Sequence, residues 1–273
     1  MKRFLVAGFV FCCSIETFGY VCTNVNCRTV RGHVDAIRSV ALVPQVDGYI
    51  SKVCFPEGGL VQKGDLLYQL EKERFQFQVD SCVAELTSTT FVVTHSQREF
   101  DRMAAADARG ITQVEMEAAF LQYETAKANV QQARASLAMA LFDLEKTQIR
   151  APIDGRIGAS AVCPGSYVSP VHAPLAQIVQ LDPIRVVFPL PVSDYVRFRK
   201  SKMPIDQMFE DVGIILPDGT RYEYSGRIDF ENNVVNEDDG MIYIGARFPN
   251  SEQLLLPNAV VDVVLKERPR KYQ

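Results

Sequence analysis

The chain has 273 residues, of which 47% are hydrophobic and 23% charged, a balance typical of a protein that buries a core. Its formal net charge is −4, which gives no electrostatic reason to expect a nucleic-acid partner. The 3 histidines and 7 cysteines form no cluster with ligand spacing, so a zinc or haem enzyme is disfavoured, and we expect no cofactor, no bound metal and no catalysed reaction.

The first residues of the chain, 1–19, are predicted to be a signal peptide. The basic pair Lys2-Arg3 precedes the almost wholly apolar run 4–13, and two small residues then permit cleavage before Tyr20. A buried amino-terminal strand is the alternative interpretation. Lipid modification at Cys13 is disfavoured, because large residues precede it where a lipoprotein signal has small ones.

Cleavage at that point leaves five cysteines in an oxidising compartment, so at least one of them has no disulfide partner. Cys22 and Cys27 are close enough in sequence to form a disulfide, and whether they do is left open. Cys54 and Cys163 lie in apolar, strand-like runs, where cysteine acts as a small hydrophobic residue. We expect none of the cysteines to be catalytic, since no adjacent histidine or basic cluster would lower a thiol pKa.

A split repeat follows. The sequence PQVDGYI at 44–50 is echoed by PIDGRI at 152–157, and in both copies a second glycine follows the first by ten residues, at Gly48 and Gly58 and at Gly155 and Gly165. Short β-branched runs between glycine turns indicate small antiparallel strands. We expect the halves, 43–76 and 147–181, to pack into one small sandwich, with tight hairpins and positive φ at Gly48 and Gly155, which each follow an aspartate.

Between the halves, residues 77–146 contain no proline and a single glycine, Gly110. Apolar residues recur there with the three–four spacing of a coiled-coil seam, at Val79, Val83, Leu86, Phe100 and Met103 and then at Met116, Phe120, Tyr123, Val130, Leu137, Leu141 and Leu144. Two gaps in the second series are filled by Ala126 or Lys127 and by Ala133 or Arg134. Thr112 is a predicted N-cap, with Glu115 completing a capping box. We expect two antiparallel helices with a turn near 107–112, each reaching about 40–50 Å.

The remaining region, 182–267, is predicted to be a small β-barrel, which strands within 20–42 join. A short helical connector is expected at 193–202. Strands are expected at 185–190, 213–216, 221–230, 241–248 and 259–265, separated by turns that include Asn232-Asn233.

Motifs spread over roughly residues 28–265 resemble those of a known family. They are Pro44-x-Val46-x-Gly48, Glu57-Gly58, Val61-x-Lys63-Gly64-x-x-Leu67, Thr147-x-Ile149-x-Ala151-Pro152-x-x-Gly155-x-Ile157, Pro164-Gly165, Leu181-Asp182-Pro183-Ile184, Asp218-Gly219, Gly226-x-Ile228-x-Phe230, Arg247-Phe248-Pro249-Asn250 and Leu255-Leu256-Pro257. With them the chain resembles the periplasmic adaptor subunits, or membrane fusion proteins of the HlyD-like family, of resistance-nodulation-division (RND) multidrug efflux pumps. The resemblance implies a mainly β fold with an inserted α-helical hairpin, in which a lipoyl-like barrel-sandwich hybrid is followed by a β-barrel.

The resemblance also implies a function. Such an adaptor lies in the periplasm, associated with the inner membrane, self-associates into a ring or partial ring, and links an inner-membrane RND transporter to an outer-membrane channel. The hairpin tip would bind the channel, through Arg102, Arg109, Ile111 and Thr112. The family tip pattern, Arg-x-x-x-Leu-x-x-x-x-x-x-Ser, is not preserved, because counting back from Thr112 gives Ala105 and Asp101. A one-residue deletion would place Arg102 in the arginine position, but the leucine position would still hold alanine.

Two further departures concern the end of the chain. Asn258 stands where the family has glycine near the last barrel strand, and asparagine tolerates the left-handed conformation. The chain ends at Gln273, so the family's membrane-proximal domain is expected to be largely absent.

Other functions stay open. The closest is an accessory protein of a type I secretion or ATP-driven export system. A more remote alternative is a biotinyl or lipoyl carrier domain modified at Lys72, although carrier domains join their halves by a tight turn. The scattered positions of His33, His95 and His172 do not favour a metal-efflux adaptor.

Overall fold

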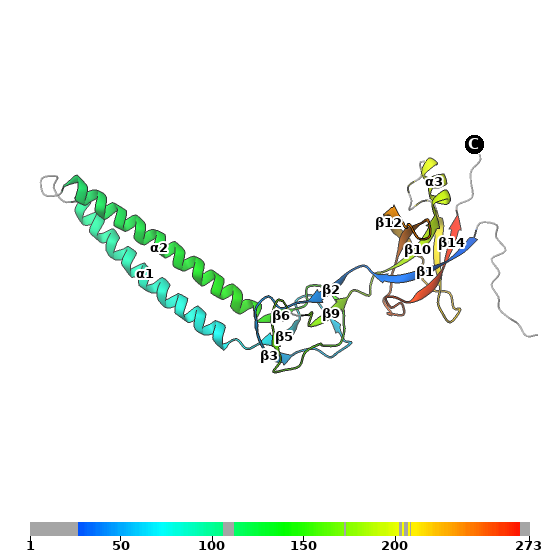
Figure 1. Ribbon diagram of the computed structural model, residues 1–273, viewed down its shortest axis with the longest axis horizontal. Coiled ribbons are helices and arrows are strands. Elements are labelled where there is room, and N and C mark those ends of the chain that lie inside the picture. The colour runs from blue at the N-terminus through cyan, green and yellow to red at the C-terminus, as the bar shows by residue number, and fades with distance from the viewer. Residues whose placement is uncertain are drawn as a thin grey trace, which may run out of the picture. The chain divides into compact units, whose positions relative to one another are not determined.

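The computed structural model describes residues 27–105, 112–171, 173–201, 204, 207 and 209–267. The chain divides into two compact units (Figure 1): one contains residues 34–185 and 249–259, and the other contains the segment up to His33, 186–248 and the segment from Val260 onward. The predicted signal peptide and Cys22 lie outside the described residues, and with Cys22 so does one partner of the possible disulfide to Cys27.

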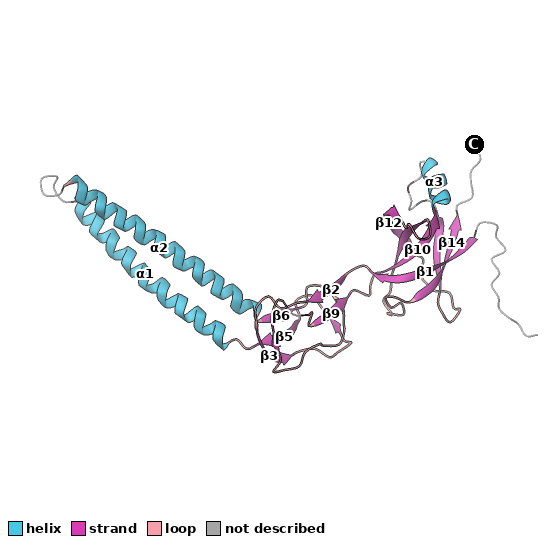
Figure 2. Ribbon diagram, in the orientation of Figure 1, coloured by secondary structure: helices cyan, strands magenta, loops and turns pink. Residues whose placement is uncertain are grey.

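The first unit contains a sandwich of two four-stranded sheets, in the orders β2-β9-β7-β4 and β6-β5-β3-β8 (Figure 2). Its strands are β2 (Ser39–Leu42), β3 (Gly48–Val53), β4 (Leu60–Val61), β5 (Leu66–Leu70), β6 (Gln148–Arg150), β7 (Gly155–Ile157), β8 (Tyr167–Val168) and β9 (Ala176–Val179). Each sheet contains strands from both halves of the repeat, since β3 pairs with β8, β4 with β7 and β5 with β6. As predicted, the two halves form one sandwich.

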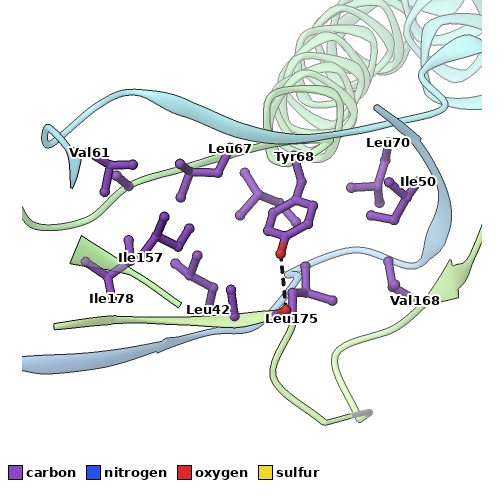
Figure 3. Close-up of a cluster of buried hydrophobic side chains, with 13 residues drawn as sticks. Leu42, Ile50, Val61, Leu67, Tyr68, Leu70, Ile157, Val168, Leu175 and Ile178 are labelled. Carbon is purple, nitrogen blue, oxygen red and sulfur yellow. Dashed lines mark hydrogen bonds between the residues drawn. The ribbon is translucent and has the colours of Figure 1, made fainter. Parts of the chain in front are cut away.

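The sandwich core contains aliphatic side chains from both halves and one buried tyrosine (Figure 3). Tyr68 is fully buried, and its hydroxyl donates to the carbonyl oxygen of Leu175 at 3.1 Å and lies 2.8 Å from Ser160 Oγ. Burial raises the pKa of this phenol, so it stays neutral. A buried phenol needs such partners, and here they join the first half of the repeat to the second.

The glycines of the repeat differ from expectation. Gly48 and Gly155 begin β3 and β7 without positive φ, whereas the second glycines, Gly58 and Gly165, have φ of +72° and +89°. The prediction of tight turns at the first glycines was therefore wrong. Gly155 is needed for close approach instead, since a Cβ there would collide with the carbonyl oxygen of Val179.

Helix α1 (Glu73–Ala105) and helix α2 (Gln113–Lys146) form an antiparallel pair, 33 and 34 residues long, and lie side by side (Figure 1). The predicted capping box is confirmed: the Glu115 amide donates to Thr112 Oγ1 at 3.3 Å, and the Thr112 amide donates to Glu115 Oε2 at 2.8 Å.

The seam between the helices has smaller side chains than predicted. Val83, Phe120 and Leu141 are exposed, while their neighbours Cys82, Ala119 and Ala140 are buried. Alanine recurs every seventh residue along the seam of α2, at Ala119, Ala126, Ala133 and Ala140. The prediction placed Phe120 and Leu141 in the seam and left two positions open, and at all four the structure buries the alanine. These alanines keep a strict heptad and let the two helices approach closely.

The second unit contains a six-stranded sheet in the order β11-β14-β1-β10-β13-β12, in which β14 runs antiparallel to β1 and β11, and β12 antiparallel to β13. Its strands are β1 (Cys27–Ala36), β10 (Ile184–Pro191), β11 (Phe209–Ile215), β12 (Arg227–Val235), β13 (Met241–Phe248) and β14 (Val260–Glu267), with helix α3 (Val192–Lys200) after β10. A β-bridge joins Val212 in β11 to Gly226, the residue just before β12. It brings the two edge strands of the sheet, β11 and β12, together as in a barrel. The turn predicted at Asn232-Asn233 was wrong, because both residues lie within β12, where the register shifts.

Candidate partner-binding surfaces of the helical hairpin

The hairpin tip contains two of the four residues predicted to bind a partner within the described part of the chain. Arg102 lies in the last turn of α1, and its guanidinium lies 3.8 Å from a Glu99 oxygen and remains largely exposed. Thr112 caps α2, so its hydroxyl is already engaged. Arg109 and Ile111 lie outside the described residues. The structure therefore brings Arg102 and Thr112 to the same end of the hairpin.

The capping carboxylate at the tip is an anion at neutral pH. Hydrogen bonds from the Thr112 backbone amide and hydroxyl lower the pKa of Glu115. This negative charge at the start of α2 also interacts favourably with the helix dipole.

At its base the hairpin is connected to the sandwich through Asp47, which the sequence analysis did not single out. Asp47 precedes β3 and accepts hydrogen bonds from Tyr167 in β8 at 2.9 Å and from Arg74 in the first turn of α1 at 3.3 Å. These two bonds lower the pKa of Asp47, the Tyr167 hydroxyl being the larger cause. The Asp47-Gly48 pair of the repeat was the available signal, but it gave no indication of the two partners.

The outer edges of the hairpin are apolar. On α2, Val114, Leu121 and Phe142 are 74%, 67% and 53% exposed, and with Ala128 and Ala135 they recur every seventh residue on the side facing away from α1. On α1, Phe77 and Phe91 are 72% and 70% exposed and lie with Ala84 at the corresponding positions. We refer to these two sets as the α2 edge and the α1 edge.

A groove runs along one flank of the distal third of the hairpin. Two hollows of about 200 and 370 Å³ share Ser96, Ala118 and Gln122. Glu99 and Glu115 line the first hollow, and Leu121 of the α2 edge lines the second. We refer to the two hollows together as the Ser96 groove.

Comparison with known families fits this architecture. Residues 38–180 match the model described as "RND MFP, barrel-sandwich hybrid domain", where MFP denotes membrane fusion protein, and residues 183–268 match "RND MFPs, beta-barrel domain". The chain belongs to the RND membrane fusion proteins. The resemblance inferred from the motifs and the predicted fold class are both confirmed.

Curated relatives of this membrane fusion protein are similar over most of its length. Multidrug resistance protein MexA of Pseudomonas aeruginosa is 33% identical over 242 residues, which are 86% of this chain and 60% of MexA. The efflux pump periplasmic linker BepF of Brucella suis is 33% identical over 85% of this chain and 57% of BepF. The chain thus spans about three fifths of the length of these relatives.

Solved structures share the fold. MacA of Actinobacillus actinomycetemcomitans has a TM-score of 0.72 at 19% identity, covering 89% of this chain and 79% of MacA. A MacA–MexA chimera with the MexA α-hairpin has a TM-score of 0.65 at 23% identity, covering 89% and 82%.

One other feature of this membrane fusion protein bears on the carrier-domain alternative. The carbonyl oxygen of Lys72 accepts the Gln76 amide at 2.9 Å, so the chain enters α1 directly at Lys72 and does not form the tight turn of a carrier domain. Among the described residues, no helix has both the length and the hydrophobicity needed to span a bilayer.

Proposed function

We propose that this protein is a periplasmic adaptor, associated with the inner membrane, that links an inner-membrane RND transporter to an outer-membrane channel for the export of drugs or other small molecules. The observation that carries the proposal is the pair of matched RND domains with a long helical hairpin inserted into the first. Relatives whose printed names are periplasmic linker or multidrug export proteins support it. The role is mechanical: we infer that the chain catalyses no reaction.

The apolar edges of the hairpin support self-association. In an isolated two-helix hairpin these outermost positions face water and are usually polar. Val79 of α1 and Ala140 of α2 pack in one cluster, so they lie at the same height along the hairpin axis. Phe77 lies two residues before Val79, and Phe142 lies two residues after Ala140. Because the helices are antiparallel, the two phenylalanines also lie at the same height, on opposite edges of the hairpin. Identical hairpins side by side would pair Phe142 with Phe77 of the next copy, and burying each ring would contribute about 1.5–3 kcal/mol.

The tip is the proposed contact with the outer-membrane channel, through Arg102, Arg109, Ile111 and Thr112. The exposed Arg102 and the anionic Glu115 offer charges of both signs at the described part of the tip. Because the Thr112 hydroxyl is engaged in the cap, its contribution to a partner contact would come from its methyl group or its backbone.

In-cell photo-crosslinking tests the proposal. A photo-reactive residue at Gln113 reports on the hairpin tip, and one at Val234 in β12, which is 61% exposed, reports on the barrel. We expect mass spectrometry to identify an outer-membrane channel from Gln113 and an RND transporter from Val234. Capture of an ATP-driven transporter instead would favour the secretion alternative, and a biotinyl or lipoyl adduct on Lys72 in the intact mass would favour a carrier domain.

A further inference from the structure

We propose that Arg98 of a second copy enters the Ser96 groove and fixes the height at which neighbouring hairpins meet. This inference rests on the side-by-side self-association proposed above and names a contact that determines its register.

The groove contains a buried hydroxyl that lacks a hydrogen-bond partner. Ser96 is 2% exposed, and its Oγ makes no hydrogen bond to any of the described residues. A hydroxyl buried without a partner costs free energy, and the small apolar side chains of Ala118 and Ala119 on α2 line the same hollow. The site therefore lacks a polar group that another molecule would supply.

Arg98 is a suitable group on the opposite edge of the same hairpin. It follows Phe91 by seven residues on the α1 edge, is exposed, and makes no ion pair among the residues that the structure describes. Val79 packs with Ala140, and because the helices are antiparallel, Arg98, 19 residues after Val79, has the same height as Leu121, 19 residues before Ala140. A neighbouring copy at equal height would bring its Arg98 against Leu121, beside the groove.

Charge and hydrogen bonding both favour this occupant. The groove wall includes the carboxylates of Glu99 and Glu115, and the capping bonds keep Glu115 ionised. A guanidinium has several N–H donors in a fixed plane, so it can donate to a hydroxyl and a carboxylate together. Because the side chain of Ala118 is small, the groove has room for a guanidinium beside it.

Self-association of the full chain, measured by sedimentation velocity over a concentration series, tests the contact. We expect Arg98→Glu to weaken association at least tenfold, and Arg98→Lys to weaken it less. Adding Gln122→Arg to Arg98→Glu should restore most of the loss, because the new arginine lies in the groove and faces the new glutamate of the next copy. Arg134→Glu makes the same charge change on α2, at an exposed residue that lines neither hollow, and should leave association unchanged.

Ser96→Ala separates a structural role from a contact role. If the hydroxyl serves the contact, the variant should be at least as thermally stable as the wild type and should associate several-fold more weakly. Unchanged association in both Ser96→Ala and Arg98→Glu would overturn the proposal.

Disulfide trapping separates this inference from the proposed function. A Phe77→Cys/Phe142→Cys variant reports on side-by-side packing in general, and an Arg98→Cys/Gln122→Cys variant reports on the groove. Trapping of both pairs between copies is expected. If only the Phe77→Cys/Phe142→Cys pair is trapped, the groove contact is wrong, and the proposed side-by-side packing still holds. If the wild type is monomeric and neither pair is trapped, both the groove contact and the side-by-side packing are wrong.

Discussion

Tyr167 and Asp47 are joined by a hydrogen bond of 2.9 Å from the phenolic hydroxyl to Oδ2, across 120 residues of sequence that include the whole hairpin. Arg74 donates to Oδ1 and to the backbone oxygen of the same aspartate. One carboxylate thus connects β8, the approach to β3 and the first turn of α1.

Removing the Asp47 carboxylate should lower the stability of the base of the hairpin slightly. Since Asp47 and Arg74 are both well exposed, we expect Asp47→Ala to lower the free energy of unfolding by about 0.5–1 kcal/mol. Urea titration of Asp47→Ala, Tyr167→Phe and the double variant measures it, and the losses should be less than additive because the two residues share a bond. Strict additivity would mean that the bond contributes nothing.

The same contact gives a pH dependence whose sign is fixed by the lowered pKa of Asp47. A carboxyl with a pKa below its ordinary value of 3.8 contributes stability above pH 3.8, and that contribution is lost as the pH falls through the folded-state pKa. The stability difference between wild type and Asp47→Ala should therefore be constant from pH 5 to 8 and shrink below about pH 4. A difference that grew on acidification would contradict this assignment.

Capping and partner binding at Thr112 can be separated by substitution. Thr112→Ala should destabilise the start of α2 by about 0.5–2 kcal/mol, seen as faster amide hydrogen exchange over the first helical turns. Thr112→Ser keeps the capping hydroxyl and should exchange like the wild type. If the methyl group also contacts a channel, Thr112→Ser should reduce photo-crosslinking from Gln113 while leaving exchange unchanged.

The small residues of the seam should resist enlargement. Ala133 is 2% exposed between the helices, so Ala133→Leu should destabilise the hairpin by about 1–3 kcal/mol. Ala138→Leu, on an exposed face of the same helix, is the matched control and should be neutral within about 0.5 kcal/mol. Thermal melts followed at 222 nm compare the two, and equal losses would show that the seam is not closely packed.

The sequence predicts contacts between residues that are close together in the chain better than contacts between distant segments. The capping box at Thr112 and Glu115 is local, so spacing alone predicted it. The seam was predicted only in outline. Hydrophobicity favours Phe120 over Ala119 as the buried residue, but packing against α1 decides which of the two is buried. The contacts of Asp47 and the roles proposed for Ser96 and Arg98 were not predicted. They depend on residues from other segments, and no single-chain pattern distinguishes these three residues from ordinary surface or seam positions.

The pairing of β5 with β6 at the base of the hairpin places Tyr68 opposite Ile149, a few residues from where α1 begins and α2 ends. Because β5 leads into α1 and β6 follows α2, their pairing fixes the register of the two helices at the base of the hairpin. This register does not depend on the length of the helices. Removing one heptad from each helix would keep every seam position in phase and shorten the reach by about 10 Å. Arm length is thus a modular property of this fold: paired heptads can be gained or lost to fit a wider or narrower space without redesign of the sandwich.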